Sequence, residues 1–434
     1  MAARSLKEVN DRWMPWIVWA LRIAVGATFI ISGCVKSIDP WGFIFKIEEY
    51  LRLWDMVQPR SLVLMGAVVL SGAEFVLGIL LLTGCYKRVV VWMMLAMMAG
   101  MLPLTLYIYL SNPVADCGCF GDFLVISNGA TFLKNLLITA ALVYLACFNR
   151  YVRGLFGAYI QWLVVFICSA YVIIIAFVGY NLQPLVDFRS FPVGRDLAVA
   201  ADDAEAEEPE FEFVYEKDGR RETFAQDALP DSTWTFVDRH IVGGYKADSD
   251  VTDFTVLDGG EDISSEIILS EGYQVLALIP EYDRADVSYT YLLNELQTAI
   301  GRIGGNMTAL ISGSQEDIEE WEDLSMAEYP IYTAEGTMLK EMARGTMALV
   351  GLHDGVIAWK RTAGSVDGEM VDALVERNTP ETDIELFDRM EFDGPVAMRN
   401  LTLVLISILA VLFLLDRSGR LLQWKSKIHR LNKN

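Results

Sequence analysis

Six long apolar runs divide the chain. Each is about as long as the roughly 20 residues that a helix needs to cross a hydrocarbon layer about 30 Å thick. The runs cover about residues 13–35, 61–83, 88–110, 131–148, 155–181 and 399–416. The stretch between the fifth and sixth runs, 182–398, has no run of this length. The pattern predicts five transmembrane helices, a large polar insert and one closing transmembrane helix.

The polar insert has the pattern of an acidic linker followed by an α/β domain. Within the linker at 182–213, residues 196–213 carry eight acidic side chains and no Lys or Arg, which is typical of solvated chain. Short apolar runs then alternate with helical spacing. The predicted order is a strand, a turn and a short helix over 253–269, a strand at 273–280, a helix at 288–304, a strand at 306–313, a short acidic helix at 315–324 and a hairpin at 346–360.

The charges of the connections predict how the helices are oriented. Lys and Arg stay on the cytoplasmic side of a membrane. They occur before the first run, in the second connection (Lys87, Arg88), in the fourth connection and in the tail after 416. The third connection, 111–130, has two Asp and no Lys or Arg, whereas the first connection is mixed. We therefore expect both termini in the cytoplasm, and the third connection and the insert outside.

These expectations give a domain plan for the chain, whose net charge of −22 and 53% hydrophobic residues reflect two kinds of sequence joined together. The predicted parts are a cytoplasmic N-terminus (1–12), a four-helix membrane domain (13–148), a fifth transmembrane helix (149–181), the acidic linker (182–213), an extracytoplasmic domain (214–398), a sixth transmembrane helix (399–416) and a basic cytoplasmic tail (417–434).

Cysteines are the first candidate chemistry. All six lie within the first five apolar runs or their connections, and two form the stretch "VADCGCFGDF" at 114–123. Cys34 is expected at the outer end of the first helix, on the same side as Cys117 and Cys119. The run "ISGC" (31–34) also fits a lipoprotein processing box, but the long apolar stretch with Arg22 inside it argues against a cleaved signal. Three thiols could therefore meet in an oxidising compartment, where disulfides persist.

The spacing of Cys117 and Cys119 leaves three interpretations open. A disulfide across two residues forms only with strain, and a strained bond is readily exchanged, so the pair could cycle, alone or with Cys34. Lys36 or Lys134 could lower the pKa of such a thiol. The other interpretations are a structural turn or static disulfide, and a metal site. A metal site is the least favoured, because the outer face offers no His and three thiols alone are unusual ligands.

Two charged residues lie inside the apolar runs, Arg22 in the first and Glu74 in the second. Each is about nine residues from the predicted cytoplasmic end of its helix, or roughly 14 Å along the axis. Opposite charges at matched depth should pair, because an isolated charge is costly in the membrane. The pair is expected either to hold two helices together or to serve a proton or quinone site.

The ordered motifs resemble the DoxX/MauE superfamily of membrane proteins. They are "RIAVGATFIISGCVKSIDPWGF" (22–43), "SGAEFVLGILLLTG" (71–84), "DCGCFGD" (116–122) and "TFLKNLL" (131–137), and the Cys-Gly-Cys-Phe-Gly run is most similar to the MauE branch. The resemblance covers about residues 15–148 and implies a four-helix bundle. It further implies a link to methylamine utilisation through maturation of a disulfide-rich subunit, or to quinone-coupled sulfur oxidation in DoxX relatives.

The insert resembles a thioredoxin-like domain over about residues 250–375. A thioredoxin would carry Cys-x-x-Cys after the strand that ends at Pro280, where this chain has "EYDRADVSY". We therefore expect the domain to bind a partner rather than to exchange thiols. His240 and His353 are isolated and are expected to be structural, and the acidity argues against nucleic acid as a partner.

The sequence thus favours two functions. In the first, a multi-pass protein of the bacterial inner membrane exchanges disulfides with periplasmic proteins through Cys117 and Cys119, with or without Cys34, and passes electrons to a membrane quinone or a partner. In the second, a non-enzymatic anchor or assembly subunit uses a redox-inactive thioredoxin-like domain as an adaptor.

Overall fold

The computed structural model describes residues 2–56, 58–114, 116–152, 154–197, 211–217, 220–225, 235–241, 254–366, 390 and 392–431. The chain forms two compact units. One, here called the membrane unit, comprises Met1–Arg189 and Asp393–Asn434. The other, the sheet unit, comprises Ser190–Phe392.

Among the described residues, six helices of the membrane unit are long and apolar enough to cross a membrane, as the six apolar runs predicted. Their apolar spans agree with the predicted runs to within a few residues, except that the fifth begins at Gln161 rather than at about 155 and the last extends over Gly394–Leu421. The helices are α1 (Ala2–Ile38), α3 (Arg60–Thr83), α4 (Lys87–Ser111), α5 (Asn128–Cys147), α6 (Gln161–Asn181) and α14 (Gly394–Leu431).

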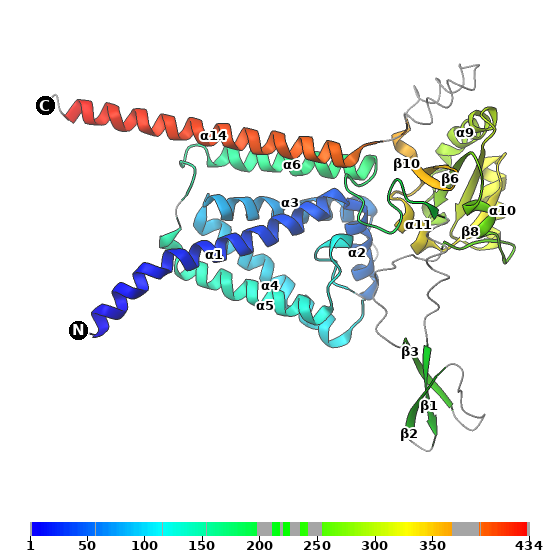
Figure 1. Ribbon diagram of the computed structural model, residues 1–434, viewed down its shortest axis with the longest axis horizontal. Coiled ribbons are helices and arrows are strands. Elements are labelled where there is room, and N and C mark those ends of the chain that lie inside the picture. The colour runs from blue at the N-terminus through cyan, green and yellow to red at the C-terminus, as the bar shows by residue number, and fades with distance from the viewer. Residues whose placement is uncertain are drawn as a thin grey trace. The chain divides into compact units, whose positions relative to one another are not determined.

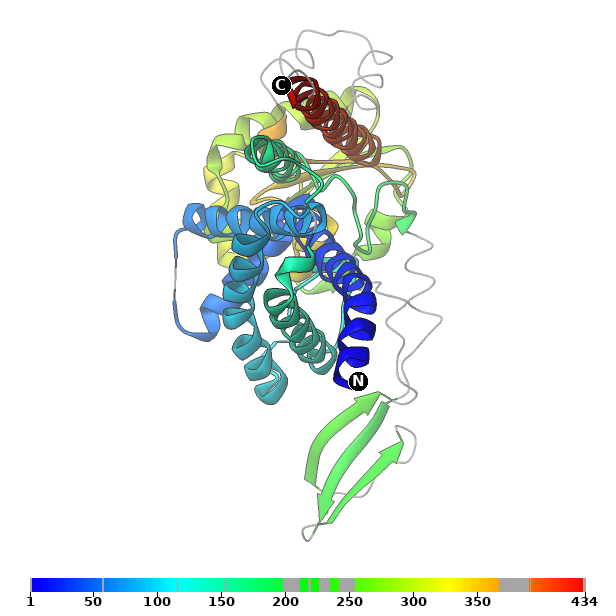
Figure 2. The ribbon, with the colours of Figure 1, turned by 90° about the vertical axis from the view of Figure 1, so that its left-hand side faces the viewer.

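Glycines bring α1 and α3 into close contact. A Cβ atom placed on Gly33 would lie 2.4 Å from the backbone nitrogen of Phe75, and one on Gly78 would lie 2.8 Å from the carbonyl oxygen of Gly26. Small residues allow such backbone approach between membrane helices. Helix α5 packs beside α4, and α14 runs along α6, where the Tyr171 and Thr402 hydroxyls are 2.9 Å apart (Figures 1 and 2).

A short helix that the apolar pattern did not predict lies in the first connection. Helix α2 (Pro40–Leu53) starts with Pro at its first position, and the Asp39 side chain caps it by accepting a hydrogen bond from the Gly42 nitrogen. Its 14 residues mix charged and aromatic side chains, so it resembles neither a membrane span nor a loop. The α4–α5 connection, which holds the thiol pair and the 3₁₀ turn η1 (Gly121–Phe123), packs against it.

The sheet unit contains a seven-stranded mixed sheet in the order β10-β9-β6-β7-β8-β4-β5. Strands β6, β7 and β8 are parallel to one another, and every other pair of neighbours in this row is antiparallel. The strands are β4 (Val256–Asp258), β5 (Glu261–Asp262), β6 (Tyr273–Ile279), β7 (Asn306–Ile311), β8 (Ile331–Ala334), β9 (Ala348–His353) and β10 (Val356–Thr362).

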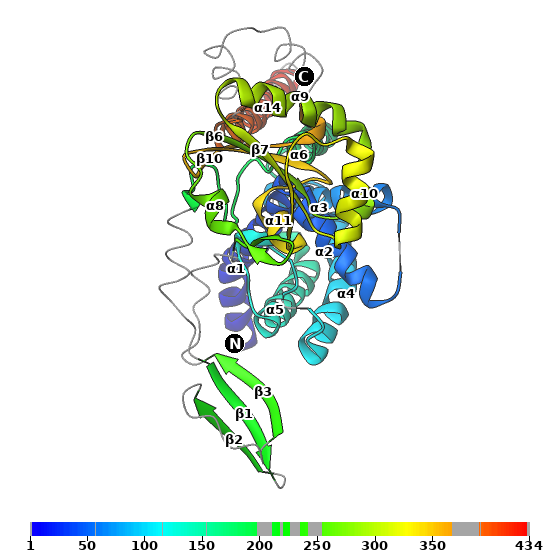
Figure 3. The same cartoon turned by 90° about the vertical axis from the view of Figure 1, so that its right-hand side faces the viewer.

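Helices cover both faces of this sheet, which explains why its central strands are continuously apolar (Figure 3). Alternate β6 side chains belong to different cores, with Val275 on one face and Leu276 on the other. The first core includes α9 (Thr290–Arg302) and α10 (Gln315–Ser325), and the second includes α8 (Ser264–Ile268) and α11 (Gly336–Met342). Strand β8 and helix α11 were absent from the predicted order. With four and seven residues, they are too short to show a clear hydrophobic period.

A separate antiparallel sheet has the order β2-β1-β3, with β1 (Phe211–Lys217), β2 (Arg220–Ala225) and β3 (Thr235–Ile241). The predicted linker at 182–213 therefore ends within a strand, since β1 begins at Phe211. Most of the acidic run at 196–213 lies outside the described residues. His240 lies in β3, and His353 ends β9 with its ring stacked on Tyr273 at 4.4 Å between centroids.

Candidate functional site

The two thiols of the Cys-Gly-Cys stretch face each other. Cys117 Sγ and Cys119 Sγ are 2.9 Å apart, and both residues are buried. Gly118 between them has φ +67°, in the left-handed region that glycine adopts without strain. A Cβ atom at this position would also lie 2.6 Å from Lys46 Cγ. The tight turn that joins the thiols therefore requires glycine.

Helix α2 fastens this turn from one side. The Tyr50 hydroxyl donates a hydrogen bond of 2.9 Å to the Cys117 carbonyl oxygen. Lys46 Nζ forms an ion pair with Asp116 at 2.8 Å, and the other Asp116 oxygen accepts a hydrogen bond from the Gly118 nitrogen. Burial raises the pKa of the Tyr50 phenol, so the phenol keeps its proton and stays a donor.

Helices α1 and α3 hold the turn from the other side through a buried ion pair. Lys36 Nζ lies 2.9 Å from both carboxylate oxygens of Glu74, and both residues are buried. Ser32 Oγ lies 2.8 Å from Glu74 Oε2 and 2.8 Å from the Cys119 carbonyl oxygen. The ion pair is thus connected to the thiol-bearing backbone by one hydroxyl group.

The partner of Glu74 differs from the predicted one. Arg22 is fully buried and donates hydrogen bonds to the carbonyl oxygens of Leu81 and Leu82, at 3.1 and 2.8 Å. Those carbonyls belong to the last turn of α3, about two turns beyond Glu74. The depth estimate failed because α1 continues well before residue 13, so that Arg22 lies level with the end of α3.

A cavity lies on the helix-bundle side of the turn and is here called the bundle cavity. Its volume is about 40 Å³. Cys119 lines it together with the Lys36–Glu74 pair, and Lys134 of α5 contributes a second ammonium group, 4.4 Å from the centre of the Phe120 ring. The lining residues are Thr28, Phe29, Ser32, Lys36, Glu74, Met97, Met98, Met101, Cys119, Phe120, Lys134, Asn135 and Ile138.

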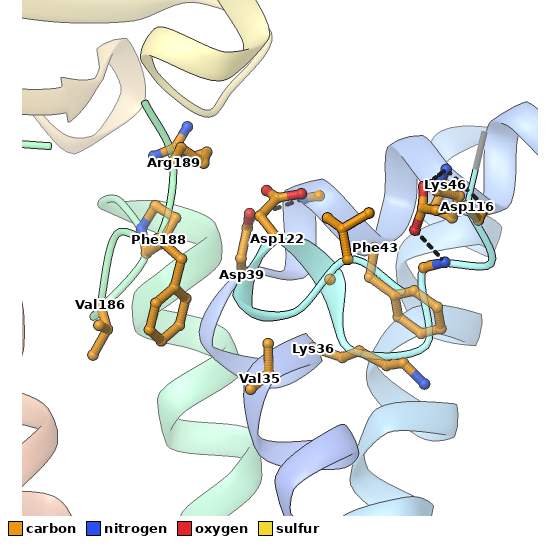
Figure 4. A pocket seen from close by; sticks show the side chains of 15 residues that line it. Val35, Lys36, Asp39, Phe43, Lys46, Asp116, Asp122, Val186, Phe188 and Arg189 are labelled. Atoms are coloured by element: carbon orange, nitrogen blue, oxygen red, sulfur yellow. Dashed lines mark hydrogen bonds and ion pairs between the residues drawn. The ribbon is translucent and has the colours of Figure 1, made fainter. Parts of the chain in front are cut away.

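A second cavity, here called the loop pocket, lies on the opposite side of the turn and has a volume of about 120 Å³. Figure 4 shows Asp39 and Asp122 close together within it and the Lys46–Asp116 ion pair apart from them. Gly118 and Gly121 present the turn to this pocket. Lys36 lines both cavities, so its side chain forms part of the wall between them.

The surroundings of the thiols make them chemically unequal. The hydrogen bond from the Cys117 thiol lowers the pKa of Cys119 to about 6, and the ammonium groups of Lys134 and Lys36 act in the same direction. The same hydrogen bond and burial raise the pKa of Cys117. The lowered pKa makes Cys119 the more readily ionised thiol of the pair, and the thiolate is the form of cysteine that acts as a nucleophile.

The structure does not bring Cys34 to the thiol pair. Ser32 and Lys36 share the face of α1 that contacts Glu74, and Cys34 lies two residues from each, about 200° around the helix. Cys85 and Cys168 are buried and Cys147 is exposed. Among the described residues, no group of three His, Cys, Asp or Glu side chains could hold a metal ion.

Three residues of the site were missed from the sequence, namely Ser32, Lys46 and Tyr50. Ser32 lacks a signal of its own, because small polar residues are common in membrane helices. Lys46 and Tyr50 lie four residues apart in the first connection, which forms helix α2. Had a helix been predicted there, this spacing would have placed both side chains on the same helix face.

Comparisons with known proteins agree with the membrane part of this description. Residues 14–148 match the family model of methylamine utilisation protein MauE, and residues 209–242 match a domain of unknown function, DUF8463. Protein TlpB of Flavobacterium psychrophilum is 26% identical over 144 residues, which cover 32% of this chain and 38% of that protein. The match thus spans less than two thirds of the relative's length. No solved structure matches the chain significantly. Over about its first third, the chain is therefore similar to MauE.

Proposed function

We propose that the chain exchanges disulfides with partner proteins through Cys117 and Cys119. The observation that carries this proposal is the pairing of a thiolate and a thiol with sulfurs 2.9 Å apart, held in a glycine turn beside two ammonium groups. Two cysteines that served only to pack the turn against its neighbouring helices would not need pKa values that differ from each other. The similarity of residues 14–148 to MauE supports a membrane role of this kind.

The exchange can be written with the chain's own atoms. The Cys119 thiolate attacks one sulfur of a partner disulfide, which forms a mixed disulfide and releases the first partner thiolate. Cys117 then loses its proton and attacks the Cys119 sulfur, which closes the Cys117–Cys119 bond and releases the second partner thiolate. Two electrons pass to the partner, and the reverse sequence would oxidise a partner dithiol.

The charge pattern supports a proposal for the side of the membrane on which this happens. The α4–α5 connection has no Lys or Arg, whereas the α3–α4 connection and the tail are basic. We place the thiols and the sheet unit on the periplasmic side of a bacterial inner membrane, where disulfides persist. The partners are then periplasmic proteins.

The sheet unit is proposed to bind those partners. The order β7-β6-β9-β10, with β6 parallel to β7 and the last two strands antiparallel, supports the thioredoxin-like interpretation. Residues 182–398 contain no cysteine, so the unit would recognise a partner without exchanging thiols itself. That absence also supports the second candidate, an assembly subunit whose sheet unit is an adaptor.

The sequence also predicted a membrane quinone as a possible electron acceptor. The bundle cavity beside the thiols does not fit a quinone. A cavity that binds a single benzene ring measures on the order of 150 Å³. The bundle cavity measures about 40 Å³. No step of the proposed exchange therefore runs through a quinone.

The exchange can be tested by trapping its intermediate. In a Cys117→Ser variant, the nucleophile remains but the mixed disulfide cannot be resolved, so partner proteins should stay linked to Cys119. The matched Cys119→Ser variant should trap far less. Cells would be quenched with acid and alkylated, and linked proteins identified by mass spectrometry. Equal trapping by both variants, or by neither, would contradict the proposal.

A further inference from the structure

The Lys36–Glu74 pair is better built for proton movement than for holding helices together. Taking both charges out of water is costly, and apolar residues of similar size often stabilise such a site equally well. The α1–α3 contact is already made by the close backbone approach at Gly33, Gly26 and Gly78. An ionisable residue kept inside a membrane bundle therefore suggests a function.

The pair also lies where a proton would have to pass. Glu74 is the single carboxylate among the residues that line the bundle cavity, and Cys119 lines the same cavity. A volume of about 40 Å³ is enough for a water molecule, which needs roughly 10–15 Å³ and two to four polar partners. Lys36, bonded to Glu74, lines the loop pocket as well.

No other carboxylate lines the bundle cavity, whereas the loop pocket, where the proton would leave, is lined by Asp39, Asp116 and Asp122. Helix α5 presents Lys134 to the bundle cavity, and α4 presents Met97, Met98 and Met101. Helix α2 presents Tyr50 and Lys46 to the turn from the other side, where Lys46 is paired with Glu49 and with Asp116 of the thiol-bearing connection. The turn itself adds only Cys117 next to Cys119.

We propose that Glu74, assisted by Lys36, carries the proton that the thiol pair releases as its disulfide closes, from the bundle cavity to the loop pocket. The Cys117 proton leaves beside Cys119, whose sulfur is 2.9 Å away and which lines the bundle cavity, and it passes through water in that cavity to the Glu74 carboxylate. Protonated Glu74 returns it by way of the Lys36 ammonium to water in the loop pocket, and the original charges are restored. This inference rests on the proposed exchange.

The test measures closure of the Cys117–Cys119 bond in the reduced full chain in nanodiscs, with oxidised glutathione as the disulfide, over pH 5 to 9 in H₂O and D₂O. Glu74→Gln should slow closure at least about tenfold and change the pH profile and the solvent isotope effect, because a positioned proton acceptor typically contributes 10²- to 10⁴-fold. Glu74→Asp should restore much of the rate. The matched control is Glu48→Gln, because Glu48 is likewise buried and paired with Arg60.

Because Glu74→Gln leaves Lys36 unpaired and could unfold the bundle, the apolar double variant Lys36→Met/Glu74→Leu provides a second test. A folded double variant with slow closure supports the proton route. Closure within twofold of the Glu48→Gln control, with an unchanged pH profile, overturns the route and leaves the exchange intact. If the wild-type chain forms no Cys117–Cys119 bond with glutathione, the proposed function itself fails.

Discussion

The hydroxyl of Tyr50 donates a hydrogen bond to the backbone carbonyl of Cys117, across 67 positions of sequence. This bond joins helix α2 to the turn that holds both thiols. A helix without any thiol of its own therefore helps to hold the pair in its buried position, and several consequences can be measured.

Replacing Tyr50 by Phe removes that hydrogen bond and keeps the ring. One hydrogen bond contributes about 1 kcal/mol, so the turn should open more often by roughly fivefold. Alkylation of Cys117 and Cys119 by a maleimide should accelerate by a similar factor, as measured by mass spectrometry. Tyr180→Phe is the control, since Tyr180 stacks on Trp41 away from the thiols. Equal acceleration in both variants would show that the bond does not hold the turn.

Gly118→Ala should displace the turn. Alanine pays about 1–2 kcal/mol for the left-handed conformation, and its Cβ would also meet Lys46. We expect slower disulfide closure between the flanking thiols and a lower melting temperature. Gly66→Ala is the control, because a Cβ on Gly66 meets nothing within 4 Å. Wild-type closure and stability in Gly118→Ala would contradict the account of the turn.

The thiolate character of Cys119 predicts a pH dependence. Its pKa is lowered to about 6 from 9.0, so its alkylation rate should rise with pH to a plateau with a midpoint near 6. Since the folded state holds the thiolate, the matching stability is fully present above pH 9 and is lost as pH falls through about 6. Lys134→Met removes one nearby ammonium and should move the midpoint upward. An unchanged midpoint would mean that Lys134 does not stabilise the thiolate.

The choice of Lys36 as the partner of Glu74 predicts a specific coupling. Glu74→Leu alone leaves a buried ammonium unpaired and should cost about 3–5 kcal/mol, whereas Lys36→Met/Glu74→Leu should recover most of this. Arg22→Met should lower the yield of folded protein through its lost bonds to α3, and adding Glu74→Leu should not restore it. The yield of folded protein, or its melting temperature in detergent, would be measured for the single and double variants of each pair, which completes a double-mutant cycle for Lys36 with Glu74 and another for Arg22 with Glu74. Recovery in the Arg22 cycle instead would favour the pairing first predicted.

The sequence predicted the parts of the fold whose physical signal is long. Six apolar runs mark membrane helices because the bilayer sets their length, and the strand at Tyr273–Ile279 is apolar throughout because helices cover both faces of its sheet. Helix α2 and strand β8 are too short, and α2 too mixed in polarity, to stand out from a connection.

The candidate site was predicted in part for a similar reason. Cys117, Cys119, Lys36 and Lys134 lie together, as their residue types and expected side of the membrane indicated. The pairing of Arg22 and the position of Cys34 depended on the phase and level of α1 against α3. Those are set by the glycine contacts between the helices, which residue spacing alone does not reveal.

The central claim is that Cys117 and Cys119 form a working redox pair, and the most direct measurement maps their disulfide state in cells. Wild-type cells would be shifted between reducing and oxidising media, quenched with acid, alkylated and analysed by mass spectrometry. We predict that a Cys117–Cys119 disulfide appears and disappears with the shift, while Cys85 and Cys168 stay reduced. Thiols at 117 and 119 that remain reduced in every medium would contradict the account.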